Sequence, residues 1–70
     1  MKLHLGETIR QLRQRDCRTQ EELALALGVS CQAVSKWERG CSYPDLDLLL
    51  PIARLFSVSL DDLFGREDVG

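Results

Sequence analysis

Apolar residues along this chain recur at the spacing expected of helices, and the alternation typical of strands is almost absent. Leu5, Ile9 and Leu12 follow one another at helical intervals, so they lie on one face of an amphipathic helix. The polar residues between them fall on the opposite face. This pattern predicts a first helix from about Gly6 to Arg15, with one apolar stripe turned toward a core.

Capping residues mark the next two helices. Thr19, followed three residues later by Glu22, fits a capping box. In this motif each of the two side chains accepts a hydrogen bond from the backbone amide of the other residue. Gly28 ends this second helix, because glycine suits a C-terminal position with positive φ. Ser30 caps a third helix, which Gly40 ends in the same way. Two short helices joined by so short a turn are typical of a helix-turn-helix unit.

The apolar pattern resumes after CSYPD, a loop with turn-forming residues. A fourth helix is expected over a series of apolar residues: Leu46, Leu49, Leu50, Ala53 and Phe56. Because Pro51 falls inside this series, the helix should either begin late, with Asp47 as its N-cap, or bend at Pro51. A short fifth helix, capped by Ser59, carries three apolar residues: Leu60, Leu63 and Phe64. Gly65 ends it, and residues 66–70 are expected to form a loose tail.

These elements predict an all-α domain of five helices over residues 1–65. Seventy residues suffice for one domain with a modest core, and 44% hydrophobic with 29% charged residues is typical of soluble globular proteins. The longest apolar run without a charge, Leu48–Ala53, is far too short to cross a membrane. The opening residues MKLHLGET lack the apolar stretch of a signal peptide, so a cytoplasmic protein is expected.

The three cysteines, Cys17, Cys31 and Cys41, are irregularly spaced, which does not fit a disulfide framework. No two of them lie at the spacing of a zinc-binding pair, and His4 is the only histidine in the sequence. Reduced thiols are therefore expected, with no metal site and no cofactor. An enzyme is not expected either, because no base accompanies the serine and cysteine nucleophiles in a recognisable arrangement.

Charge is distributed unevenly along the chain. The net charge is −2, whereas proteins that bind nucleic acids usually present a basic surface. Residues 1–40 contain seven Lys/Arg and five Asp/Glu, a net charge of +2, while residues 41–70 contain two and six, a net charge of −4. The first part can therefore face phosphate groups while the second faces away from them.

The third predicted helix carries the candidate chemistry on its outward face, which has no acidic residue: Gln32, Ser35, Lys36 and Arg39. Such a face suits the major groove of DNA, where glutamine pairs with adenine and lysine donates to guanine. A polar face could also simply be exposed to solvent. The helix-turn-helix pattern is the observation that favours contact with DNA. The free amides at the start of the second helix form an anion site, where Thr19 and Gln20 would contact a backbone phosphate.

The stretches TQEELALALGVS, AVSKWERG, SYPDL and FSVSLDDLFG resemble the Cro/phage-repressor (Xre-type) helix-turn-helix family, over residues 5–64. The resemblance implies a compact five-helix, phage-repressor-like domain that binds operator DNA as a symmetric dimer. It implies base contacts from one set of residues: Cys31, Gln32, Ser35 and Lys36. The expected phosphate contacts form a second set: Arg13, Thr19, Gln20, Arg39, Ser42 and Tyr43. Arg13 and Glu38 match a family ion pair that ties the first helix to the third.

The leading hypothesis is a sequence-specific transcription regulator, a repressor of bacterial or phage origin, that binds double-stranded DNA at a palindromic operator. A homodimer is expected through residues 58–64, with Leu60 and Leu63 turned inward and Phe64 at the edge; alternatively, these side chains only close the core of one monomer. No membrane contact and no small-molecule ligand are expected. The alternative function is a protein-interaction module, such as a coactivator-type adaptor or an antitoxin, which the acidic composition and an outward-facing Leu25 favour.

Overall fold

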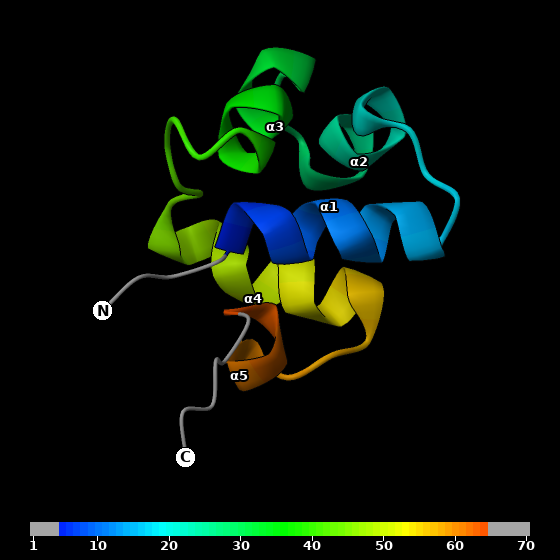
Figure 1. Ribbon diagram of the computed structural model, residues 1–70, viewed down its shortest axis with the longest axis vertical. Helices are drawn as coiled ribbons and strands as arrows, with labels where there is room; N and C mark the ends of the chain where they lie inside the picture. The colour runs from blue at the N-terminus through cyan, green and yellow to red at the C-terminus, as the bar shows by residue number, and fades with distance from the viewer. Residues whose placement is uncertain (1–4, 65–70) are drawn as a thin grey trace.

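The computed structural model describes residues 5–64, and every regular element in this range is a helix. The five helices are α1 (Leu5–Arg15), α2 (Gln20–Leu27), α3 (Cys31–Glu38), α4 (Leu46–Phe56) and α5 (Leu60–Leu63). In the view of Figure 1, α1 lies between the α2–α3 pair and the α4–α5 pair. The all-α, five-helix prediction is confirmed, while the expectations for Gly65 and for residues 66–70 lie outside the described residues.

The hydrophobic core draws on all five helices. Its buried members are Leu5, Ile9, Leu23, Ala24, Val34, Trp37, Ile52, Ala53, Phe56 and Leu63. No polar or charged residue falls in the buried class within residues 5–64. The hydrophobic effect therefore holds the helices together, with each amphipathic helix turning one face inward.

Gly6 allows α1 to begin directly against the end of α3. A Cβ atom at this position would lie 2.0 Å from the backbone carbonyl oxygen of Trp37, a distance that no real side chain tolerates. The missing side chain therefore sets how closely the two helices approach. The sequence pattern identified Gly6 only as the start of a helix, because this contact joins residues far apart in the chain.

All four longer helices end in the same left-handed turn. Gly28 (φ 72°) and Gly40 (φ 78°) take this conformation after α2 and α3, which confirms both predicted ends. The amide of the glycine and that of the following residue donate to carbonyls of the last helical turn. Cys17 (φ 57°) and Ser57 (φ 59°) form the corresponding turns after α1 and α4, although neither is a glycine.

The predicted caps are present at three helix starts. Thr19 and Glu22 form both hydrogen bonds of the capping box, with the Thr19 amide donating to the Glu22 carboxylate at 2.8 Å. Ser30 and Ser59 accept hydrogen bonds from the amides of residues 33 and 62, at the starts of α3 and α5. These bonds satisfy amides that a helix start leaves without a partner.

The start of α4 differs from one of the two alternatives drawn from the sequence. The helix begins at Leu46, with Asp45 rather than Asp47 at the N-cap position, so the late start is wrong. Asp45 makes no capping hydrogen bond through its side chain, and Pro51 lies inside the helix. Because proline has no N–H, the carbonyl of Asp47 lacks its usual partner four residues along.

The orientation predicted for Leu60 is also wrong. Leu63 is fully buried, but Leu60 is 39% exposed, and Phe64 is partly buried. The helix α5 has four residues, a single turn, so Leu60 and Leu63 point about 60° apart around its axis. Leu63 can then fill the core while Leu60, in the first position, stays at its rim.

We predict that Ser57→Gly raises the free energy of unfolding by about 0.5–1 kcal/mol, because a residue with a Cβ is strained at positive φ whereas glycine is not. Urea denaturation at neutral pH measures the change. Ser42→Gly is the matched control, since Ser42 is not among the residues with positive φ. The control should lose stability through the added freedom of the unfolded chain. Equal losses in both variants would contradict the prediction.

Candidate nucleic-acid interface

The pair α2–α3 forms a helix-turn-helix unit. The helices contact each other directly and are joined by a turn at residues 28–30. Ala24 on α2 is 4% exposed, and Val34 on α3 is fully buried, so a small side chain and an apolar anchor meet where the helices cross. Trp37 closes the inner face of α3, which leaves the other face of this helix turned outward.

The carboxylate of Glu38 joins three helices. It accepts hydrogen bonds from Nε of Arg13 at 2.6 Å and from Nη2 of the same residue at 3.1 Å, and the amide nitrogen of Gln20 donates to it at 3.0 Å. The side chain of Glu38 is only 4% exposed, and that of Arg13 is 14% exposed. The hydrogen bond to Glu38 raises the pKa of Arg13, so its guanidinium stays charged.

Arg13 also fixes the loop that precedes α2. Its Nη1 donates to the backbone carbonyl of Arg18 at 2.9 Å. The start of α2 is thus held against α1 from two sides, through Gln20 and through this loop. The sequence indicated the ion pair between Arg13 and Glu38, whereas the hydrogen bond of Gln20 to Glu38 had no sequence signal.

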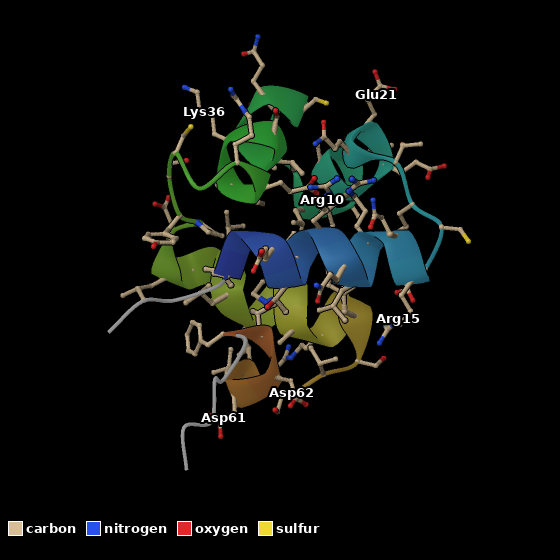
Figure 2. All side chains as sticks on the ribbon, in the orientation of Figure 1. Arg10, Arg15, Glu21, Lys36, Asp61 and Asp62 are labelled. Carbon is tan, nitrogen blue, oxygen red and sulfur yellow. The ribbon has the colours of Figure 1, made fainter. Side chains whose placement is uncertain are left out.

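The outward face of α3 carries the residues expected to contact bases. Gln32, Lys36 and Arg39 are exposed, while Cys31 and Ser35 are partly buried. Figure 2 shows Lys36 on the side of α3 away from α1. The one acidic residue of α3, Glu38, turns inward to Arg13, so acidic side chains do not interrupt this face. The face can therefore accept a polyanion.

Two shallow hollows flank Gln20. The first, of about 480 Å³, lies at the junction of the α1–α2 loop, the start of α2 and the start of α3, and is lined by Arg13, Cys17, Arg18, Thr19, Gln20, Glu21 and Cys31. The second, of about 280 Å³, lies where α1 and α3 approach Gln20, and is lined by Arg10, Arg13, Gln14, Gln20, Ser35, Glu38 and Arg39. The structure thus brings together most of the expected phosphate-contacting residues, except Ser42 and Tyr43, which line neither hollow.

Two arginines in these hollows were missed as site residues. Arg10 is exposed on the polar face of α1, which was the available signal for it, and Figure 2 labels it on the side of α1 facing α2 and α3. Arg18 lies in the α1–α2 loop, where no pattern indicated a role. Arg15, by contrast, already has hydrogen-bond partners within the chain. Its guanidinium donates to the carboxylate of Asp16 and to the backbone carbonyl of Phe56 at the end of α4. The hydrogen bond from Arg15 lowers the pKa of Asp16.

Known proteins resemble the chain over most of its length. A helix-turn-helix family model matches residues 9–63. The HTH-type transcriptional activator BcrR of Enterococcus faecalis is 42% identical over 96% of this chain and 33% of its own length, and the HTH-type transcriptional regulator ImmR of Bacillus subtilis is 36% identical over 96% and 53%. The chain thus spans about a third to a half of these two relatives.

A solved relative with the same fold is bound to DNA. The P22 c2 repressor in complex with a synthetic operator is 34% identical and superposes with a TM-score of 0.83, over 97% of this chain and 100% of the other. Within residues 5–64, the helices are too short or too polar to span a membrane. The match to the family model over residues 9–63 decides the assignment: the chain belongs to the helix-turn-helix family.

Proposed function

We propose that this chain binds double-stranded DNA in a sequence-specific manner and regulates transcription. It is a repressor of bacterial or phage origin that acts in the bacterial cytoplasm. The observation that carries the proposal is the outward face of α3, which is polar and free of acidic side chains and adjoins the start of α2. A helix with this character fits the major groove. The operator-bound P22 c2 repressor supports the same mode of binding.

In this proposal, α3 reads the bases. Gln32 and Lys36 are exposed and have the donors that recognise adenine and guanine, and the partly buried Cys31 and Ser35 make shorter-range contacts. The start of α2 contacts the DNA backbone. Thr19 lies at the N-cap, and Gln20 uses one amide hydrogen for Glu38, which leaves the second hydrogen for a phosphate oxygen.

The remaining proposed phosphate contacts surround α3. Arg13 has five N–H donors and uses three of them within the chain, so two remain. Arg39 follows the end of α3, and its Nε lies 3.4 Å from the carbonyl oxygen of Ser35. Ser42 and the 57% exposed Tyr43 would contact the backbone on the other side of the groove.

Salt-dependent binding to DNA tests the proposal. Fluorescence anisotropy with a mixed-sequence duplex should give an affinity that falls steeply as salt rises, because binding releases counterions. Selection from a random duplex pool should then recover one preferred sequence, bound about a thousandfold or more tightly than the mixed duplex. Absence of binding to either DNA at low salt would contradict the proposal and favour a protein-interaction module.

We predict that Lys36→Ala weakens binding to the selected site by about 1–3 kcal/mol and relaxes the preference at one guanine, since Lys36 is exposed in the middle of α3. Competition among duplexes that differ at single positions measures the change. Gln20→Ala is the contrasting variant and should weaken binding about equally on all sequences, because phosphates carry no base identity. The role of Lys36 would be wrong if its variant also behaved uniformly.

We predict that two chains bind one palindromic duplex, because the recognition helix of one domain reads only a few base pairs. The proposed contact is the segment of residues 58–64, where Leu60 is 39% exposed. Twofold pairing would place two copies of α3 about 34 Å apart, one turn of DNA. Analytical ultracentrifugation with the palindromic duplex counts the chains. A strict one-to-one complex at protein excess would exclude this assembly.

A further inference from the structure

Arg18 is a partly buried cation whose Nε–H group has no hydrogen-bond acceptor among the described residues. It lies in the α1–α2 loop, directly before Thr19, the N-cap of α2. Its Nε is buried and has no hydrogen-bond partner among residues 5–64, the only such side-chain atom in this range. Asp16 is hydrogen-bonded to Arg15, which lowers the pKa of Asp16 most, and the charge of Arg18 lowers that pKa further without a hydrogen bond. Arg13 is paired with Glu38.

A buried N–H group without an acceptor is unfavourable in the isolated chain. Burial removes the water that would solvate the Nε–H group, and no acceptor within the described part of the chain replaces that water. Methionine has a similar unbranched stem of four atoms, which reaches about as far as Nε and carries no N–H group that needs an acceptor. The Nε–H group recovers the lost interaction when an acceptor from outside the described residues binds beside it.

The surroundings of Arg18 select an anion as this acceptor. Arg18 lines the hollow of about 480 Å³ together with Arg13 and Gln20, so two arginines and a glutamine border one space. The first-turn amides of α2 adjoin the same hollow. Thr19 caps the amides of residues 22 and 23, whereas those of residues 20 and 21 have no recorded acceptor among the described residues. Glu21 is the only acidic residue that lines the hollow.

We infer that Arg18 binds a backbone phosphate of DNA in this hollow, next to the phosphate contacts of Thr19 and Gln20. The inference rests on the proposed function, because it takes DNA as the source of the phosphate. It adds a cation to the DNA-binding surface of a chain whose net charge is −2. It also accounts for the unpaired Nε, since movement of the side chain toward a phosphate would give the guanidinium acceptor oxygens.

Salt-dependent binding by Arg18→Met tests this assignment. Fluorescence anisotropy with the mixed-sequence duplex should give a slope of log K against log salt that is smaller by about 0.9, the value for one phosphate contact. Affinity near 0.1 M salt should fall about eightfold, equally on all sequences. Arg18→Lys keeps the charge and should retain most of the slope. Arg54→Met removes the same charge from the exposed surface of α4 and is the matched control, expected to bind as the unmodified chain does.

A thermal melt of each variant separates this role from a structural one. Arg18→Met should keep or raise the melting temperature while it weakens DNA binding, because it removes an unpaired buried group. A lower melting temperature together with an unchanged slope would identify Arg18 as a structural residue and overturn the inference. An unchanged slope and affinity in a stable variant would overturn it as well. If the unmodified chain fails to bind DNA, the proposed function itself fails.

Discussion

The bidentate ion pair between Arg13 and Glu38 is the interaction on which the arrangement of α1, α2 and α3 depends. A nearly buried carboxylate at the end of α3 is unfavourable by itself, because it loses its hydration and lies at the negative end of a helix. Arg13 and Gln20 supply its hydrogen bonds from two other helices. Loss of one partner of such a pair typically costs about 3–5 kcal/mol, so the carboxylate strongly favours this one arrangement. The start of α2 and the outward face of α3 are thereby held as one unit.

The ion pair requires close packing at the other end of α1. Gly6 lets the backbone of α1 approach the carbonyl of Trp37, and Ile9 and Val34 fill the space behind this contact as fully buried side chains. Arg13 lies two helical turns further along α1, where it meets Glu38, the neighbour of Trp37. The apolar core sets the distance between α1 and α3, and the polar contact sets their rotation. Neither could be replaced by the other, since burial is not directional whereas a bidentate hydrogen bond is.

Local signals made α2 and α3 predictable from the sequence, and the features that were missed depend on contacts between distant residues. Thr19, Ser30, Gly28 and Gly40 each act within a few residues, so their roles could be read directly. The left-handed turns at Cys17 and Ser57 were not anticipated, because residues with a Cβ do not favour this conformation and so give no sequence signal for it. The exposure of Leu60 and the hydrogen bond from Gln20 to Glu38 likewise depend on neighbours far along the chain. The polar outward face of α3 was accessible because it follows from the period of one helix.

The fold turns the uneven charge of the sequence into a charge separation in space. Figure 2 shows Lys36 and Arg10 on the side of α2 and α3, while Asp61 and Asp62 lie at the opposite end on α5. Glu21 is an exception on the side of α2 and α3, where it lies in the first turn of α2 and interacts favourably with the helix dipole. A polyanion would attract one end of the molecule and repel the other, and so orient the domain before contact. An overall negative charge is therefore compatible with binding DNA, because the electrostatic interaction depends on which face the charges occupy and not on their sum.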